Sequence, residues 1–113
     1  MIKIYHNPRC SKSREGLLEL ETLNQPIEII KYLDNPISKE ELQDILKKLN
    51  YKPIELVRKN ESIWKKQYKD LKLSDDAIIN AMIEHPKLIE RPIIIKDNKA
   101  VVARPKEKIK EIL

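Results

Sequence analysis

Residues 2–14 read Ile2-Lys3-Ile4-Tyr5-His6-Asn7-Pro8-Arg9-Cys10-Ser11-Lys12-Ser13-Arg14. This stretch decides the fold. Its alternating, β-branched start predicts a short strand, which Pro8 closes because proline cannot donate to a sheet ladder. The leucines that follow, Leu17, Leu20 and Leu23, have helical spacing. We therefore expect a strand, a turn at Asn7-Pro8 and a helix that opens at Cys10.

The only cysteine of the chain stands at the start of this expected helix. A helix N-terminus presents unpaired backbone N–H groups and the positive end of the helix dipole, and both favour a negative charge. In such a setting the pKa of a thiol falls from ~8.5 into the range of roughly 3.5–7.5. Arg9 and Arg14 add positive charge nearby. The stretch predicts a reactive Cys10 thiolate in a loop suited to an anion; the alternative is an inert, hydrophobe-like cysteine.

The composition indicates a globular chain that works in a reducing compartment. Of 113 residues, 41% are hydrophobic and 36% charged, which suits one folded domain. A single cysteine excludes an internal disulfide, and neither a long apolar run nor a signal-peptide pattern occurs. We expect a cytoplasmic monomer that does not span a membrane. One cysteine and two distant histidines are also too few ligands for a His/Cys metal site.

The net charge of +5 raises the question of nucleic-acid binding. The lysines, however, are dispersed along expected helices beside glutamates, which is typical of a solvated face. Aromatic residues that could stack on bases are few. The sequence therefore argues against a nucleic-acid partner.

The middle of the chain predicts one more strand and then a block of helices. Residues 27–30 form a β-branched run that could extend to Tyr32. Ser38 and Glu41 form a capping box before a helix, and Ser74 precedes another. A short helix after Pro53 and a segment around Trp64 lie between them. Residues 37–86 are therefore expected to be helical, without any strand.

The last part of the chain predicts a hairpin and a final helix. Residues 91–95 and 100–103 are strand-like and flank a tight turn, and Pro105 suits the first turn of a closing helix. The order β-α-β, helical insertion, β-β-α is that of a thioredoxin-like α/β domain with a mixed sheet. We expect residues 1–113 to form this single domain, with 37–86 as an inserted helical subdomain that covers a cleft beside Cys10.

Two arginines bracket the expected hairpin. Arg91 and Arg104 each precede a proline, and antiparallel pairing would place them side by side at one end of the sheet. The planar guanidinium fork suits bidentate contacts with an oxyanion. The helical block could bring Arg58 to the same place. Alternatively, Arg91 and Arg104 form surface salt bridges with neighbouring glutamates such as Glu90.

Several motifs along the chain match one known family in the same order and with the same spacing. They are the 6–14 loop, Tyr32-Leu33, Leu56-Val57-Arg58-Lys59-Asn60, His85-Pro86-Lys87-Leu88-Ile89-Glu90-Arg91-Pro92-Ile93 and Arg104-Pro105. With them the chain resembles the glutaredoxin-linked arsenate reductases of the ArsC type, which are thioredoxin-like proteins. The end at Leu113 favours a short chromosomal member of that family.

The resemblance implies roles for the matching residues. Cys10 would attack arsenate, His6 would tune the loop and the cysteine, and Pro92 would be a cis-proline beside the site. The oxyanion would be held by Arg58, Arg91 and Arg104. With one cysteine and no bound cofactor, glutathione would attack the arsenylated Cys10 and glutaredoxin would complete the cycle. Ser13 takes the place of the second sulfur of a Cys-x-x-Cys motif; it could hydrogen-bond the thiolate but could not resolve it.

Two other functions stay open on the sequence. One is a redox-linked regulator that binds RNA polymerase, as the Spx-type relatives do. Those relatives typically carry Cys-x-x-Cys and a longer C-terminus, so Ser13 and the end at Leu113 count against it. The other is a general glutathione-dependent thiol oxidoreductase that acts on small disulfides.

Overall fold

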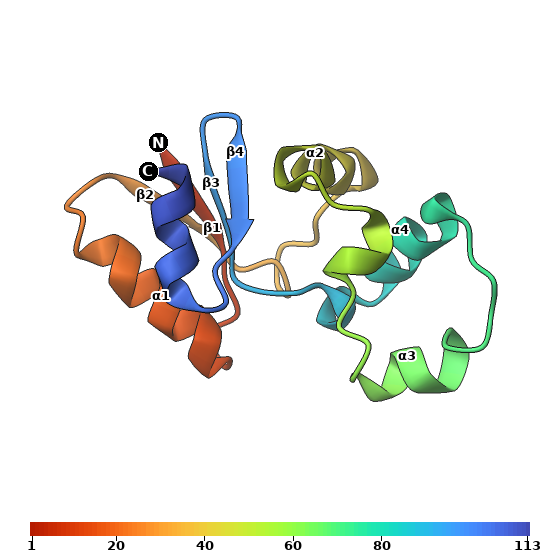
Figure 1. Ribbon diagram of the computed structural model, residues 1–113. Coiled ribbons are helices and arrows are strands. Elements are labelled where there is room, and N and C mark those ends of the chain that lie inside the picture. The colour runs from red at the N-terminus through yellow and green to blue at the C-terminus, as the bar shows by residue number, and fades with distance from the viewer. The chain divides into compact units, whose positions relative to one another are not determined.

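The computed structural model describes all residues from 1 to 113, and the chain divides into two compact units (Figure 1). The sheet unit consists of Met1–Asn35 and Arg91–Leu113, and the helical unit of Pro36–Glu90. The helical unit contains the block 37–86 that the sequence predicted to be helical.

The elements follow the expected order. The strands are β1 (Ile2–Tyr5), β2 (Ile27–Ile30), β3 (Ile93–Lys96) and β4 (Lys99–Val102). The α-helices are α1 (Ser11–Glu21), α2 (Lys39–Leu49), α3 (Ser62–Gln67) and α4 (Asp75–Glu84). Short 3₁₀ helices are η1 (Pro53–Leu56), η2 (Pro86–Leu88) and η3 (Lys106–Ile112).

The sheet is mixed, as the sequence predicts. Its strand order is β2-β1-β3-β4; β1 and β2 are parallel, whereas β1–β3 and β3–β4 are antiparallel. Ile4 lies opposite Ile29 on one side and Ile94 on the other, and Ile94 lies opposite Val101. This β-α-β and β-β-α arrangement places the start of α1, the end of β1 and the residues before β3 at one edge of the sheet.

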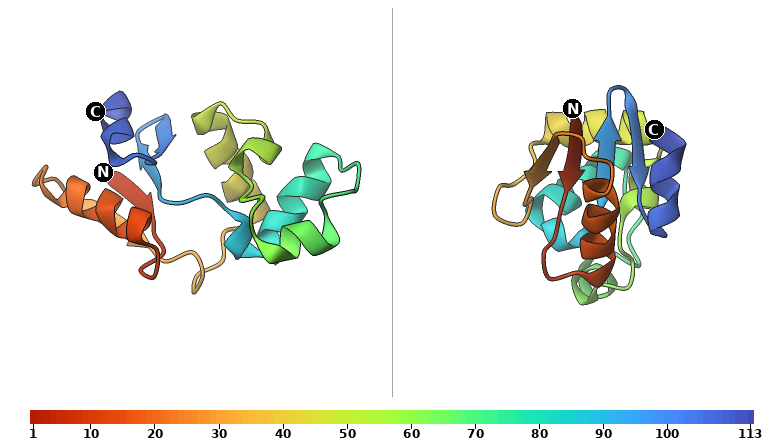
Figure 2. Two further views of the ribbon diagram at one scale, coloured as in Figure 1. Left: turned by 60° about the horizontal axis from the view of Figure 1, so that its bottom comes forward. Right: turned by 90° about the vertical axis from the view of Figure 1, so that its left-hand side faces the viewer.

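One face of the sheet forms the core of this unit with α1 and η3. Figure 2 shows both helices on the same side of the strands. The buried residues that meet there are Ile2, Ile4, Leu20, Ile94, Val101, Ala103, Ile109 and Ile112. Burial of one such aliphatic side chain contributes about 1.5–3 kcal/mol to stability. The core therefore ties α1, which begins at Cys10, firmly to the hairpin.

The helical unit has its own core, and its helix starts follow from the sequence. The hydroxyls of Ser38 and Ser74 accept hydrogen bonds from the N–H groups of Glu41 and Ala77, so both predicted caps are confirmed. Helix α4 packs against α2, η1 and η2 through an apolar face. The buried side chains in this unit include Leu42, Ile45, Leu46, Leu56, Ile78, Met82 and Leu88.

No strand lies within 37–86, as predicted, although Val57 forms an isolated antiparallel bridge with Ile89. Two details differ from the prediction. Strand β2 ends at Ile30 rather than Tyr32. The closing helix is a 3₁₀ helix that begins at Lys106, with Pro105 as its cap rather than in its first turn.

Two X–Pro peptide bonds are cis. One is Arg91–Pro92, as the resemblance implied, and the other is Arg104–Pro105, which the sequence did not predict. Separately, none of the helices combines the length and the apolar character that a membrane crossing requires.

Candidate active site

The loop that carries Cys10 is closed by local hydrogen bonds. The N–H of Cys10 donates to the carbonyl of Asn7 over 3.0 Å, which makes Asn7–Cys10 a tight turn. The side-chain oxygen of Asn7 accepts from the N–H of Arg9, also at 3.0 Å. The Arg14 guanidinium donates to the carbonyl of Pro8 at 2.9 Å. These bonds hold Cys10 as the residue that caps α1, as predicted.

The surroundings of the Cys10 thiol stabilise its ionised form. Burial raises the pKa of this half-buried thiol, but other groups outweigh that effect and hold the pKa below its ordinary value. They are the backbone N–H groups of Ser13 and Lys12 and the guanidinium of Arg91. The thiol makes no short capping bond, and the first turn of α1 contains no acidic residue that would oppose a thiolate. The structure thus brings the predicted nucleophile together with one of the predicted arginines.

Ser13 and His6 form a buried pair beneath the loop. Ser13 is fully buried, and its Oγ lies 2.7 Å from His6 Nδ1 while accepting a 3.0 Å hydrogen bond from the N–H of Asn7. Burial lowers the pKa of His6, the positive charges of Lys31 and Arg14 lower it further, and the hydrogen bond to Ser13 only partly compensates. His6 is therefore neutral at neutral pH.

These contacts revise the expected role of Ser13. The sequence suggested a hydrogen bond from its hydroxyl to the thiolate. The hydroxyl instead bonds to His6 and Asn7, and the backbone N–H of Ser13 acts on the sulfur. His6 contacts Ser13 rather than the thiol, so any tuning of the cysteine by His6 passes through Ser13. Lys31, which the sequence reasoning missed, adds its charge from the residue after β2.

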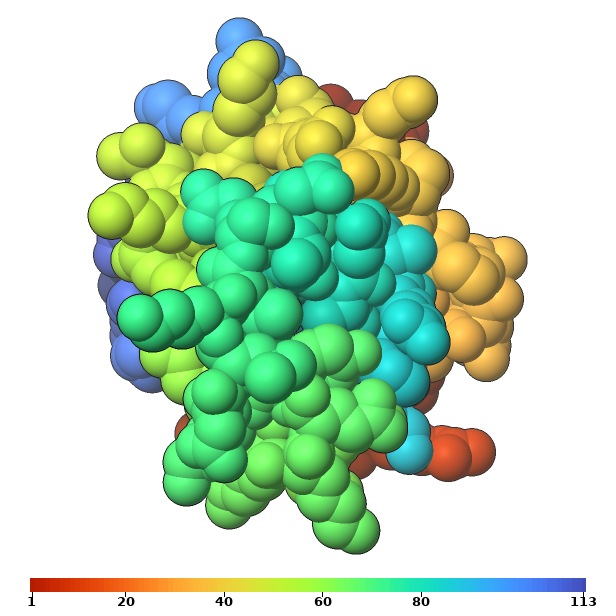
Figure 3. All heavy atoms as spheres, turned by 90° about the vertical axis from the view of Figure 1, so that its right-hand side faces the viewer, coloured from red at the N-terminus to blue at the C-terminus, as the bar shows by residue number.

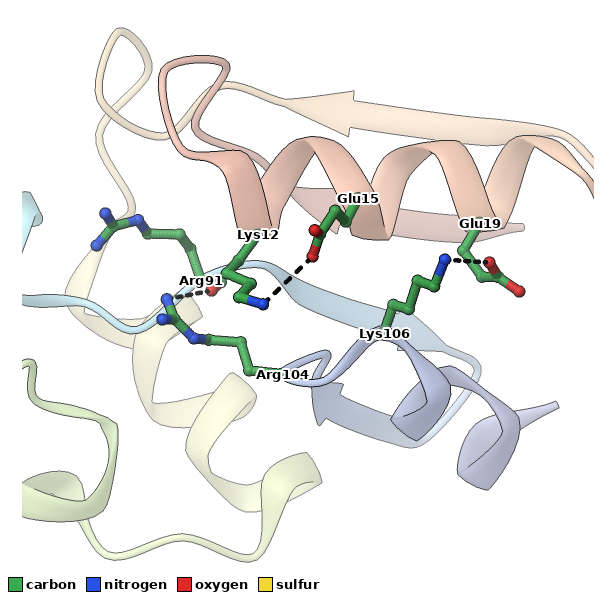
Figure 4. Close-up of polar contacts among 6 residues, drawn as sticks. All are labelled: Lys12, Glu15, Glu19, Arg91, Arg104 and Lys106. Carbon is green, nitrogen blue, oxygen red and sulfur yellow. Dashed lines mark hydrogen bonds and ion pairs between the residues drawn. The ribbon is translucent and has the colours of Figure 1, made fainter.

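Arg91 and Arg104 lie beside each other at the base of the hairpin, as predicted. Arg104 Nη1 donates to the carbonyl of Arg91 over 3.4 Å, and Figure 4 shows both side chains extending to the same side. The Nε atom of Arg91 is buried and makes no hydrogen bond. A buried unpaired donor is costly and calls for an acceptor.

Arg58 belongs to the helical unit. Its guanidinium lies 3.6 Å from Glu61 Oε1 and 3.9 Å from Glu90 Oε1, so it forms ion pairs within its own unit. Its role in an oxyanion site stays a prediction.

Gly16 is a positioning residue that the sequence reasoning did not single out. A Cβ atom at this position would lie 2.8 Å from Cγ of Pro92 and 3.9 Å from Cβ of Ala103. These two neighbours directly follow Arg91 and precede Arg104, so α1 touches the hairpin where the arginines are held. The sequence feature that could have identified this residue is the glycine itself, because a glycine within a helix costs about 1 kcal/mol relative to alanine.

Two exposed ion pairs involve side chains of α1. Lys12 pairs with Glu15 at 3.6 Å, and Lys106 at the start of η3 pairs with Glu19 at 3.8 Å (Figure 4). Such exposed pairs contribute little to stability. No cluster of three or more His, Cys, Asp or Glu side chains is arranged to hold a metal ion.

We expect the Cys10 thiol to ionise at a lower pH in the folded protein than in the unfolded one. Because folding lowers this pKa, the thiolate stabilises the fold above the ordinary thiol pKa, and this stabilisation is lost as the pH falls through the lowered value. The rate of alkylation by iodoacetamide against pH measures both states, since Cys10 is the only thiol. The same midpoint for native and urea-unfolded protein would contradict the expectation.

Ser13→Ala should destabilise the protein by about 1–3 kcal/mol, because it leaves the Asn7 N–H and His6 Nδ1 without their partner. Ser11→Ala is a matched control, since Ser11 is exposed on the same helix turn. Its effect should stay within about 0.5 kcal/mol. Urea unfolding measures both variants, and equal losses would show that the buried hydroxyl has no special role.

Comparison with known proteins identifies the family and supports the fold. The sequence model of the ArsC family matches residues 5–112. The chain is 44% identical to the uncharacterized protein YfgD of Escherichia coli, over 99% of this chain and 96% of that protein. It is 43% identical to an arsenate reductase of Neisseria meningitidis, over 99% of this chain and 97% of the relative.

A solved structure shows the same arrangement. An arsenate reductase from Vibrio cholerae matches with a TM-score of 0.94 and 45% identity, over 99% of this chain and 97% of that one. The fold is thioredoxin-like, as the element order predicted. Because the family match spans nearly the whole chain and includes the Cys10 loop and both hairpin arginines, the protein is a member of the ArsC family.

Proposed function

We propose that this protein reduces arsenate to arsenite, with Cys10 as the nucleophile and glutathione and glutaredoxin as the source of electrons. The observation that carries the proposal is the lowered pKa of the Cys10 thiol beside Arg91. A thiolate, rather than a thiol, is the attacking species. The names of the relatives in Neisseria meningitidis and Vibrio cholerae support the choice of arsenate.

In the first step the Cys10 sulfur bonds to As(V), and one arsenic–oxygen bond breaks to release water after protonation. The sulfur and the incoming oxyanion repel each other, so positive charge must offset the repulsion. Arg91 is suited to this because its buried Nε still lacks an acceptor that an arsenate oxygen could provide. Arg104 lies next to it. Arg58 is proposed as a third cation, and Pro92 as the residue that holds Arg91 in place.

The electron balance requires a second thiol. Reduction of As(V) to As(III) takes two electrons, which come from two sulfur atoms that leave joined as a disulfide. Cys10 is the only cysteine, and Ser13 stands three residues on. The other sulfur must therefore come from another molecule, which we take to be glutathione, with glutaredoxin reducing the glutathione-bound intermediate. A reducing cytoplasm supplies such thiols.

The test is steady-state arsenite production with glutathione and glutaredoxin, each omitted in turn. Omission of either should remove most of the arsenate-dependent rate: without glutathione Cys10 stays arsenylated, and without glutaredoxin it stays in a mixed disulfide with glutathione. Full turnover with a dithiol protein such as thioredoxin, and without glutathione, would contradict the proposed electron source. No arsenite under any condition would contradict the reaction itself.

A general exchange of thiols with small disulfides is the second candidate, because the activated single thiol suits it equally well. Reduction of a glutathione mixed disulfide without arsenate measures that activity. Competition between arsenate and the disulfide substrate distinguishes the two candidate functions. Arsenate should inhibit the disulfide reaction only if it binds at Cys10.

A further inference from the structure

The helical unit contains a hollow of about 680 Å³ that the proposed reaction does not use. Its apolar lining residues are Ile54, Trp64, Leu71, Leu73 and Ile78, and its polar ones are Lys59, Asn60, Lys65, Lys69 and Asp75. They come from η1, the segment 57–61, α3, the segment 68–74 and the first turns of α4. Figure 3 looks onto the face where α3 and the segment 68–74 lie, drawn in green.

The interior of the hollow is aromatic and aliphatic. Trp64 is only 6% exposed, and its ring stacks on Tyr68 with 5.5 Å between the centroids. Leu71, which also lines the hollow, is 59% exposed, so its side chain is accessible to a ligand. A volume of this size matches pockets that enclose a small organic molecule, since such sites are mostly apolar with a few polar groups.

The charge around the hollow has one predominant sign. The lining includes three lysines, Lys59, Lys65 and Lys69, but only one acidic residue, Asp75. None of these lysines forms an ion pair within the protein, whereas other lysines, such as Lys39 and Lys48, do. Unpaired cations around an apolar pocket attract an anion and repel a cation.

We propose that this hollow binds a small organic anion with an apolar, preferably aromatic, body, such as an aromatic carboxylate or sulfonate. The rings would contact Trp64, Leu71 and Leu73, and the acidic group would lie among the lysines. The proposal does not depend on arsenate reduction, because every lining residue belongs to the helical unit and none is assigned to the reaction.

The chain provides its own reporter for a test. Trp64 is the only tryptophan, so energy transfer from tryptophan emission to a bound dye reports binding at this hollow. Anilinonaphthalene sulfonate is the probe, and phenylnaphthylamine, which has the same rings without the sulfonate, is the neutral comparison. We expect saturable quenching of Trp64 by the sulfonate and a Kd about tenfold weaker for the neutral dye.

Reversing the charge of two lining lysines tests whether the acidic group of the ligand binds beside them. The double variant K65E/K69E should weaken sulfonate binding about tenfold, because two attractions become repulsions. Lys66→Glu is the matched control, since Lys66 is exposed on the same helix but does not line the hollow. It should change the Kd by less than about twofold. Thermal unfolding and circular dichroism verify that each variant is folded.

A second variant covers the apolar contact. Leu71→Asn replaces an exposed side chain with an uncharged polar one of similar size, so the fold should survive while dye binding weakens by a similar factor. Three results would overturn the proposal: equal affinity for the charged and the neutral dye, an unchanged Kd in both lining variants, or an equal loss in the Lys66 control.

Discussion

Cys10→Ser is expected to abolish arsenate-dependent turnover while leaving the fold intact. A serine hydroxyl does not ionise near neutral pH, so the backbone N–H groups of Lys12 and Ser13 and the Arg91 guanidinium would have no thiolate to stabilise. The exchange of sulfur for oxygen changes the volume little. Arsenite formation should fall to the rate measured without protein.

The control for Cys10→Ser is a measurement of its free energy of unfolding. Urea unfolding of Cys10→Ser at a pH below the lowered thiol pKa should match the wild type, because neither side chain is then charged. Arsenite production above the background rate in this variant would contradict the role of Cys10. Such a result would mean that another group attacks arsenate.

Arg91→Ala should also have a large effect, both on the pKa of the Cys10 thiol and on kcat/KM for arsenate. The pKa of the Cys10 thiol should rise toward its ordinary value, because a hydrogen bond and a charge interaction from Arg91 are lost. In addition kcat/KM for arsenate should fall about 10- to 100-fold, which corresponds to one charge-assisted hydrogen bond of about 1.5–3 kcal/mol. Alkylation against pH and initial rates of arsenite formation measure the two effects.

Two further variants, Arg91→Lys and Arg9→Ala, test whether the effect requires the guanidinium of Arg91 or only positive charge near Cys10. Lysine keeps the charge but not the planar fork, so it should restore part of the thiol pKa and little of the arsenate affinity. Arg9 directly precedes Cys10 but is exposed, and it is not among the groups that lower the thiol pKa. Losses in Arg9→Ala as large as those in Arg91→Ala would show that general positive charge, rather than the position of Arg91, supports the reaction.

Much of the fold could be predicted because its signals are local. The alternation in Ile2–Tyr5, the serine caps at Ser38 and Ser74 and the leucine spacing in α1 each depend on neighbours within a turn or two. The helix start at Cys10 followed from the same kind of signal. The adjacency of Arg91 and Arg104 could be predicted as well, since a short hairpin brings its two ends together.

Other features depend on contacts between distant segments. Val57 and Ile89 pair across most of the helical unit, and no local pattern indicates that bridge. The inward direction of the Ser13 hydroxyl depends on the buried ring of His6, which comes from the end of β1. The close approach at Gly16 depends on how α1 packs on Pro92.

The sequence by itself determined the order of the elements, the thiol at a helix start and the family resemblance. It did so because strand alternation, helix spacing and caps are properties of neighbouring residues. Only the tertiary structure decided which groups act on that thiol. Pairing of β1 with β3 brings Arg91 from far along the chain to Cys10, while Arg9 and Arg14, the nearest arginines in sequence, do not act on the sulfur. Charge acts through space, and distance in space is set by packing rather than by position in the chain.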